Sequence, residues 1–448
     1  MSKQFDLIVI GTGSAGSSVA KKCVGAGWKV AIIDSRPFGG TCSQRGCDPK
    51  KVLVGAAEVV DWQRRMKANG VSGKDVQIDW AELMRFKRTF TESVPDRTQR
   101  ELTEVGITTF HGRAQFTDAT TLQVNEETLT GRYVVIAAGA KPVDLGIPGI
   151  EFVTTSDQFL DLDALPKRIV FIGGGYISFE FAHIAVRAGS EVTILHKGKR
   201  PLEGFDADLV QQLSEASREV GIDLQTEIEV TKIEQKDKSF LIHTSKDSKP
   251  IPADLVVHGA GRVPDIDDMA LEKAGIERSK RGIVVNEFLQ SVSNSAVYAA
   301  GDAADSDGLP LTPVASAEAS VVARNLLEGN KTKPNFTATP SVVFAIPPLA
   351  SVGLTEEEAK EQALKFKVNY EETSTWYTSR RTNEKHTGFK ILVEEGSGRI
   401  LGAHLLGAHA EEVINLFALA IRHNLCDTDL TDMLYAYPTF TSDLGYML

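Results

Sequence analysis

The stretch Ile10-Gly11-Thr12-Gly13-Ser14-Ala15-Gly16 decides the fold of the N-terminal part of this chain. An apolar segment at 5–10 precedes it, a helix-forming segment follows, and a second apolar segment at 30–33 ends at Asp34. In such a β-α-β unit, glycines permit a tight turn, close approach to a pyrophosphate and close helix–strand packing. We therefore predict a dinucleotide site that consists of Gly11, Gly13, Ser14 and Gly16, with Asp34 accepting ribose hydrogen bonds.

The same pattern recurs in the middle of the chain. A strand is expected at 168–172, followed by Gly173-Gly174-Gly175-Tyr176-Ile177-Ser178, a helix from Phe179 and a strand at 192–195. His196 follows Gly173 at the offset at which Asp34 follows Gly11. Two such units indicate two nucleotide sites; the alternative is a Gly-rich turn in an α/β fold that binds no nucleotide.

The charges at the second site favour NADPH. NAD-binding units end the second strand with an acidic residue, whereas a 2′-phosphate requires cations at this position. Here His196 is followed by Lys197, Lys199 and Arg200. The alternative is a solvated basic turn without phosphate preference. The predicted residues of this site are Gly173, Gly175, Tyr176, Ser178, His196, Lys197 and Arg200.

Two cysteines, Cys42 and Cys47, follow the first unit in the segment Gly39–Lys51. A close thiol pair can cycle between dithiol and disulfide, which is a two-electron reaction. Residues at this spacing in a regular helix lie about 7.5 Å apart along its axis, whereas a disulfide tolerates Cα separations up to about 7 Å. We therefore expect a distorted helix start at Gly46 and Pro49. Helix N-terminal amides and Lys50 would favour the thiolate.

Taken together, these motifs resemble the flavin-dependent pyridine nucleotide–disulfide oxidoreductases, and glutathione reductases most among them. The resemblance covers the whole chain through Gly11–Gly16, Gly40–Lys51, Ala137–Gly139, Gly173–Glu180, Gly301-Asp302, Leu311–Ala315 and Val352–Thr355. It implies an α/β fold with two Rossmann-like dinucleotide-binding domains and an α+β C-terminal dimerisation domain. It also implies FAD and NADPH as cofactors and a homodimer whose active site is completed by the tail of the other subunit.

The resemblance also implies roles for individual residues. Cys42 attacks the substrate disulfide, and Cys47 exchanges electrons with the flavin. Lys50 and Glu180 form an ion pair beside the flavin, and Tyr176 is a lid for the nicotinamide. Asp302 binds the ribityl chain of FAD, and Thr312 places its backbone amide near the flavin ring. The remaining predicted cofactor-binding residues are Gly40, Thr41, Lys51, Gly139, Gly261 and Arg262. No metal ligand is predicted.

The C-terminal tail departs from the family pattern. Tyr437 stands where the family has a histidine, and Ser442 stands where it has a glutamate. Tyr437 is the remaining candidate acid for protonating the leaving thiolate. A low-molecular-weight disulfide is the predicted substrate, although Lys21 and Ser320 match the pattern for glutathione only in part. The alternatives are reduction of quinones or metal ions by flavin and dithiol, or a non-catalytic FAD redox sensor.

Length and composition bound the organisation of the chain. Its 448 residues predict an FAD domain at 1–146, an NAD(P)H domain at 147–264, a central segment at 265–335 and an interface domain at 336–448. A net charge of −11 argues against nucleic acid and anionic membranes as partners. Four cysteines and the short apolar N-terminal run predict a cytoplasmic protein with a role in cell redox homeostasis.

Overall fold

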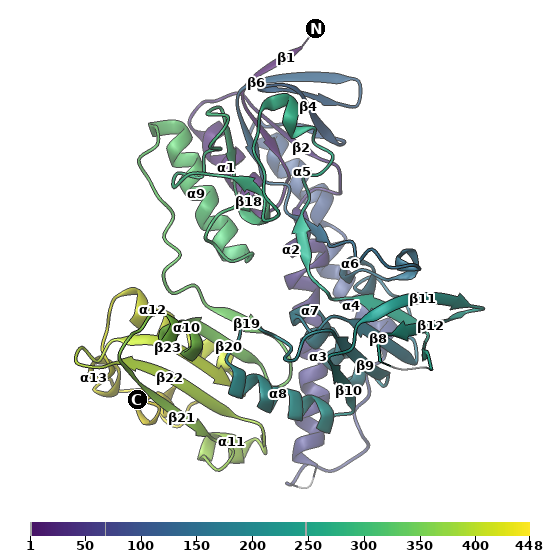
Figure 1. Cartoon of the computed structure of the whole chain (residues 1–448), viewed down its shortest axis with the longest axis vertical. Helices are drawn as coiled ribbons and strands as arrows, with labels where there is room; N and C mark the ends of the chain where they lie inside the picture. The colour runs from purple at the N-terminus through teal and green to yellow at the C-terminus, as the bar shows by residue number, and fades with distance from the viewer. Residues whose placement is uncertain (1, 68, 247–248) are drawn as a thin grey trace. The chain divides into compact units, whose positions relative to one another are not determined.

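The chain divides into two compact units, each of which is described separately. The computed structural model describes residues 2–67, 69–246 and 249–448 (Figure 1). The first unit comprises Met1–Lys50, Phe86–Val143 and Arg262–Phe336, and the second Lys51–Arg85, Asp144–Gly261 and Thr337–Leu448. The predicted α/β class is confirmed, whereas the finer four-domain division stays a prediction.

A mostly parallel sheet forms the centre of the first unit. Its order is β3-β2-β1-β6-β5-β4, and β17 pairs with β6 on a separate branch. The strands are β1 (Lys3–Ile10), β2 (Val30–Asp34), β3 (Thr108–His111), β4 (Ala114–Asp118), β5 (Thr121–Val124), β6 (Glu127–Ile136) and β17 (Val297–Ala299). The run Leu7–Ile10 in β1 is buried, as expected for a central parallel strand covered on both faces. Helices α1 (Ser14–Gly25) and α9 (Thr312–Glu328) lie side by side in this unit (Figure 1).

The segment with the two cysteines consists of two helices rather than one. Helix α2 (Gly40–Arg45) ends at Gly46, and α3 (Cys47–Met66) begins directly after it. Gly46 has φ −141° and ψ −121°, which interrupts the helical path. The distortion that we expected from the spacing of Cys42 and Cys47 is thus confirmed at Gly46. Two further helices follow, α4 (Trp80–Thr91) and α5 (Val94–Glu104).

A second parallel sheet, of order β10-β9-β8-β14, lies in the second unit. Its strands are β8 (Arg168–Ile172), β9 (Glu191–His196), β10 (Ile222–Thr226) and β14 (Leu255–His258). Helices α7 (Tyr176–Arg187) and α8 (Ala207–Glu219) belong to this part, as does the small antiparallel sheet formed by β11 (Val230–Lys236), β12 (Ser239–Thr244) and β13 (Ile251–Ala253). The predicted strand at 168–172 matches β8. The helix begins at Tyr176, however, and not at Phe179, because Gly175 serves as its extended N-cap.

An antiparallel sheet of order β19-β20-β23-β22-β21 forms the C-terminal part of the second unit. Its strands are β19 (Ser341–Val343), β20 (Leu349–Gly353), β21 (Phe366–Glu372), β22 (Gly388–Glu394) and β23 (Ile400–Leu406). Helix α12 (Ala410–Arg422) packs its apolar side chains on this sheet, and α10 (Glu356–Glu361), α11 (Tyr377–Arg381) and α13 (Asp427–Thr431) flank it. Among the described residues, no helix combines the length and apolar character needed to cross a membrane.

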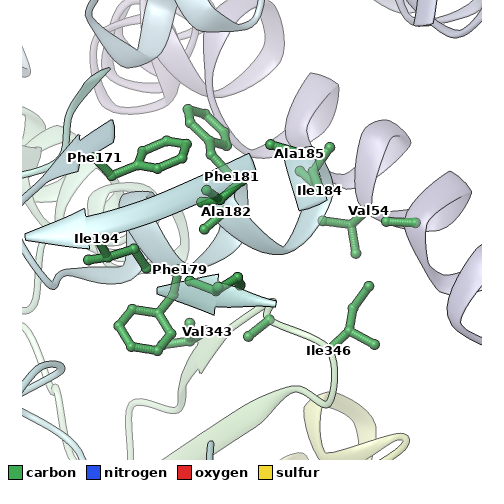
Figure 2. Packing of buried hydrophobic residues seen from close by; sticks show 14 of the residues in the cluster. Val54, Phe171, Phe179, Phe181, Ala182, Ile184, Ala185, Ile194, Val343 and Ile346 are labelled. Carbon is green, nitrogen blue, oxygen red and sulfur yellow. The ribbon is translucent and has the colours of Figure 1, made fainter. Parts of the chain in front are cut away.

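One apolar core joins the nucleotide helix α7 to the C-terminal part of the second unit. Figure 2 shows Phe179 and Ala182 of α7 near Val343 of β19 and Ile194 of β9. Val54 of α3 contributes to the same core. The fully buried Phe179 side chain therefore helps to fix the start of α7, where the second Gly-rich turn ends.

A buried charge network ties α3 to α7 within the second unit. Asp61 accepts hydrogen bonds from Arg187 (2.6 Å) and from Arg65 (2.7 Å), and Arg65 lies 3.2 Å from Glu384. Burial raises the pKa of Glu384 to about 7, against the attraction of Arg65. Desolvation of this carboxylate therefore outweighs the ion pair.

Glu384→Gln should make the protein more stable at alkaline pH. A carboxyl pKa that rises from 4.5 to about 7 on folding contributes stability below pH 4.5, which is lost as pH rises through 7. The stability advantage of the Gln variant should therefore grow by about 3 kcal/mol between pH 4.5 and pH 8. Urea unfolding of both proteins across this pH range measures it. Glu361→Gln, at an exposed glutamate, is the control, and a pH-independent difference between Glu384→Gln and the parent would contradict the prediction.

Candidate active site

The first Gly-rich turn leaves bare backbone at the carboxyl end of β1. A Cβ atom on Gly11, which has φ +104°, would lie 2.2 Å from the carbonyl oxygen of Ala137. A Cβ atom on Gly40 would lie 2.4 Å from Cα of Gly13. Only glycine fits these positions, and the N-terminal end of α1 follows at Ser14. This cradle fits a pyrophosphate, as the predicted dinucleotide site requires.

Asp34 holds this turn from the end of β2. Its Oδ2 atom accepts hydrogen bonds from the Thr12 amide (2.8 Å) and the Thr12 hydroxyl (2.5 Å), and its Oδ1 atom accepts one from the Arg36 amide (2.9 Å). Oδ2 thus uses both of its lone pairs, whereas Oδ1 keeps one lone pair for a further donor. The structure thus places Asp34 beside the predicted cradle, while its hydrogen bond to a ribose stays a prediction.

The helix break at Gly46 brings the two thiols together. Cys42 is half-buried and Cys47 is exposed, and a hydrogen bond joins the two side chains. Thr312, the first residue of α9, has its hydroxyl 3.8 Å from Sγ of Cys47. The structure therefore brings Cys42, Cys47 and Thr312 to one place, as the predictions for each residue require.

The surroundings of Cys42 in the dithiol state favour its protonated form. The hydrogen bond with Cys47 raises the pKa of the Cys42 thiol, burial raises it further, and Thr312 opposes both. The charge of Asp48 also raises this pKa, and Sγ of Cys42 lies 3.9 Å from Oδ1 of Asp48. A reduced partner thiol and an acidic neighbour thus both favour the protonated form of Cys42, while thiolate stabilisation by helix amides and Lys50 stays a prediction.

The two residues of the predicted ion pair belong to different units. Lys50 is buried in the first turn of α3, at the end of one segment of the first unit. Glu180 is buried in α7 of the second unit, and its Oε1 atom accepts a hydrogen bond from the Phe344 amide (2.9 Å). Lys51 packs its Nζ 4.6 Å from the centre of the Phe344 ring and pairs with Glu58. The Lys50–Glu180 pair itself stays a prediction.

Asp302 lies in the single 3-10 turn Gly301–Ala303, which follows the end of β17 at Ala299. It is half-buried, and burial raises its pKa while Arg262 opposes the shift. Arg262 begins β15 (Arg262–Pro264), which pairs with β7 (Ala140–Pro142), and it donates a hydrogen bond to the Ala140 carbonyl. Gly139 and Gly261 adjoin this strand pair, and both have positive φ values.

Glu318 is a site residue that the sequence reasoning missed. Its Oε2 atom accepts a hydrogen bond from the Gly301 amide, and its Oε1 atom accepts one from the Ser306 hydroxyl, each at 2.6 Å. Glu318 thereby holds both ends of the loop that contains Asp302. Its signal was an acidic residue on the buried face of α9, which otherwise presents Ala315, Ala319 and Val322.

The second Gly-rich turn repeats the arrangement of the first. A Cβ atom on Gly173, which has φ +102°, would lie 2.5 Å from the Gly259 carbonyl oxygen. Nδ1 of His196 accepts a hydrogen bond from the Gly174 amide (3.1 Å), and Nε2 of His196 donates one to the Arg200 carbonyl (2.9 Å). The Nδ1 contact requires the neutral tautomer with its proton on Nε2.

The remaining predicted residues of the second site lie around this turn. Tyr176 is half-exposed at the first position of α7, and Lys197 is exposed. Ser178 is fully buried, with its Oγ facing Gly259 rather than the turn. Arg200 lies 3.7 Å from Glu357. This carboxylate competes for a cation that we predicted to bind the 2′-phosphate of NADPH.

The tail presents Tyr437 to solvent in the isolated chain. The Tyr437 side chain is 79% exposed. Ser442 donates a hydrogen bond to the Thr439 carbonyl (2.6 Å) and therefore serves in a local turn. At the other predicted substrate position, Nζ of Lys21 forms an ion pair with Glu101 at 3.0 Å.

The first unit has a dithiol beside a dinucleotide cradle, and the same chain has a second cradle. These features are typical of flavoproteins that pass electrons between a pyridine nucleotide and a disulfide. The family model "Pyridine nucleotide-disulphide oxidoreductase" matches residues 5–319, and its dimerisation domain matches residues 339–447. The chain belongs to this family of FAD-dependent oxidoreductases, and the dimerisation domain supports a homodimer.

Characterised relatives match over nearly the whole chain. A mercuric reductase of Staphylococcus aureus is 32% identical over 446 residues, which cover 98% of this chain and 81% of the relative. A glutathione reductase of a Nostoc species is 32% identical over 464 residues and is covered in full. The solved structure of the flavoprotein disulfide reductase RclA from Escherichia coli, in its Cu(II) complex, matches with a TM-score of 0.89 at 27% identity, over 100% of this chain and 99% of that one.

Glu318→Ala should weaken the binding of FAD. The change leaves the Gly301 amide and the Ser306 hydroxyl without their acceptor, which costs about 1–3 kcal/mol. Because these groups hold the Asp302 loop, we expect the dissociation constant for FAD to rise about tenfold or more. Titration of the deflavinated protein with FAD measures this constant. Glu328→Ala, at an exposed position of the same helix, should leave it unchanged; an equal loss in both variants would contradict the role of Glu318.

Proposed function

We propose that this protein is an NADPH-dependent reductase of a low-molecular-weight disulfide that acts through Cys42 and Cys47. The observation that carries the proposal is the contact between the two side chains across the helix break at Gly46. The accessible Cys47 and half-buried Cys42 fit a substrate that must reach sulfur. A cytoplasmic setting belongs to the proposal, because a reducing compartment keeps such a pair available for turnover.

The residues of this chain would divide the reaction as follows. Cys42 attacks the substrate disulfide, and Cys47 then displaces the second thiol by forming the Cys42–Cys47 disulfide. Lys50 and Glu180 would place a charge pair beside the flavin, and Asp302 would hold its ribityl chain. FAD and the nicotinamide, when bound, supply the two electrons that return the disulfide to the dithiol. Tyr437 from a second subunit would donate a hydrogen bond to the departing sulfur.

A specific observation supports a second candidate, the reduction of metal ions. One relative is a mercuric reductase, and the solved RclA structure is a Cu(II) complex. Two adjacent thiols are soft ligands that suit such ions. This acceptor releases no thiol, so that the Ser442 and Tyr437 replacements in the tail would matter less. We favour disulfide reduction over metal-ion reduction, because Cys42 and Cys47 suffice for it without further metal ligands.

Cys42→Ser should abolish disulfide turnover while NADPH still bleaches the flavin absorbance. The hydroxyl of serine cannot attack a disulfide under these conditions, whereas electron entry from NADPH does not involve Cys42. Steady-state NADPH oxidation with a disulfide, together with anaerobic flavin bleaching, measures the two steps. Cys426→Ser is the matched control, because Cys426 is the N-cap residue of α13 and its thiol donates a hydrogen bond to Asp429. Undiminished disulfide turnover in Cys42→Ser would remove the proposal.

Lys197→Gln should impair NADPH selectively. At the end of the second strand, His196 stands where NAD-binding units have an acidic residue. The exposed Lys197 follows it directly. Loss of one charged hydrogen bond to a 2′-phosphate costs about 1.5–3 kcal/mol, so that the KM for NADPH should rise about tenfold or more. The KM for NADH should not change. Lys167→Gln removes an exposed lysine at the far end of β8 and should affect neither coenzyme; an equal loss for both coenzymes in Lys197→Gln would refute NADPH preference.

A further inference from the structure

An aspartate lies beside the attacking thiol, at a position that the sequence reasoning left without a role. Asp48 is the second residue of α3, and it directly follows Cys47. Its Oδ1 atom lies 3.9 Å from Sγ of Cys42, which is within the distance at which a thiol donates a hydrogen bond to a carboxylate. Asp48 is exposed, and therefore it can also reach a bound substrate and water.

Of the groups that neighbouring elements place near Cys42, Asp48 is the acidic residue in contact with its thiol. Helix α9 contributes Thr312, whose hydroxyl is neutral. Helix α2 ends with Arg45, and α3 contributes Lys50 and Lys51. Lys50 is buried, and Lys51 pairs with Glu58 about two turns further along α3. Among the described contacts of Cys42, the ionisable partners are thus Cys47 and Asp48.

The reaction needs a group that accepts and returns a proton. Cys42 holds its proton in the reduced state, because its thiol pKa is raised by Cys47, by burial and by the charge of Asp48. The thiolate is the form that attacks a disulfide. A small alkyl thiolate leaves poorly unless it is protonated, because the rate depends on the pKa of the leaving thiol. A group in contact with Cys42 could serve both needs.

We propose that Asp48 is a catalytic residue that transfers the Cys42 proton to the departing thiol of the substrate. This proposal rests on the proposed function, since it assigns a step within disulfide reduction. It gives the proton transfer to the same subunit that holds the dithiol. Tyr437 of a second subunit would then orient the departing sulfur rather than supply its first proton.

The step balances as follows. The Cys42 proton moves to the Asp48 carboxylate as Sγ of Cys42 bonds to one sulfur of the substrate, and the substrate S–S bond breaks. The proton passes from Asp48 to the departing thiolate, which leaves as a thiol. Sγ of Cys47 then attacks Sγ of Cys42, the mixed disulfide breaks, and the second thiolate leaves with the Cys47 proton. The dithiol loses two electrons, the substrate gains two, and Asp48 ends as a carboxylate.

Asp48→Asn tests the proposal through two rates that should change in opposite directions. Loss of the negative charge lowers the pKa of the Cys42 thiol, so that iodoacetamide should alkylate Cys42 several-fold faster at neutral pH. Loss of the proton carrier should lower kcat/KM for hydroxyethyl disulfide about 100-fold. Peptide mass analysis of reduced protein follows alkylation, and NADPH oxidation follows turnover.

A pair of substrates separates proton transfer from a structural effect. Dithiobis-nitrobenzoate releases an aryl thiolate that needs no proton, so that Asp48→Asn should slow its reduction far less than that of hydroxyethyl disulfide. Asp48→Glu should restore part of the activity with the alkyl disulfide. Asp96→Asn is the matched control, because Asp96 is also an exposed acid in the first turn of a helix beside a proline. It should change no rate.

Three results would overturn the proposal. Equal losses with both disulfides would show that Asp48 acts through structure, and faster turnover together with faster alkylation would show a purely electrostatic neighbour. Unchanged alkylation would show that Asp48 does not act on Cys42. If the parent protein reduces neither disulfide, the proposed function fails by itself, and the alkylation rates still decide whether Asp48 controls the Cys42 thiol.

Discussion

The close approach of Gly46 to the backbone of Cys42 is the constraint on which the redox site depends. A Cβ atom on residue 46 would lie 3.0 Å from the Thr41 carbonyl oxygen and 3.1 Å from Cα of Cys42. Glycine allows the chain to pass that closely, and α3 can then restart with Cys47 at its first turn. In a continuous helix the two cysteines would be separated by more than one turn. The helix break therefore converts two thiols at an unfavourable spacing into one site.

The two Gly-rich turns are stabilised in the same way by different side chains. In each turn, the residue at the end of the second strand accepts a hydrogen bond from the amide that follows the first glycine. Asp34 does so from Thr12, and His196 does so from Gly174. Both side chains therefore stabilise the turn itself. The Asp34 carboxylate retains one lone pair, on Oδ1, for a ribose hydroxyl, whereas the neutral imidazole of His196 has used its only acceptor atom. The second site therefore lacks the acidic residue that the first site has, but its turn is still held by a hydrogen bond to the end of the second strand.

Local patterns predicted more of this molecule than long-range ones. The apolar run of β8 and the distortion at Gly46 follow from residues close in sequence. The interleaving of the units does not, because β17 pairs with β6 and β15 pairs with β7 across long sequence separations. Glu318 was missed because it bonds to a loop that precedes its own helix. Asp48 lies six residues after Cys42, but their contact depends on the path of the chain through the helix break at Gly46. Each acts on a group from another turn or helix, and motif spacing contains no information about that contact.

The acidic neighbour of Cys42 shows how one contact can both hinder and assist a reaction. A negative charge beside a thiol disfavours the thiolate, which by itself would slow the attack. A thiol of higher pKa is, however, the stronger nucleophile once it is deprotonated. The carboxylate that imposes the first effect is also placed to accept the proton at the moment of attack. When the proton stays within the site, the thiolate forms only as the sulfur–sulfur bond forms, and the half-buried Cys42 thiol is protected from other electrophiles between turnovers.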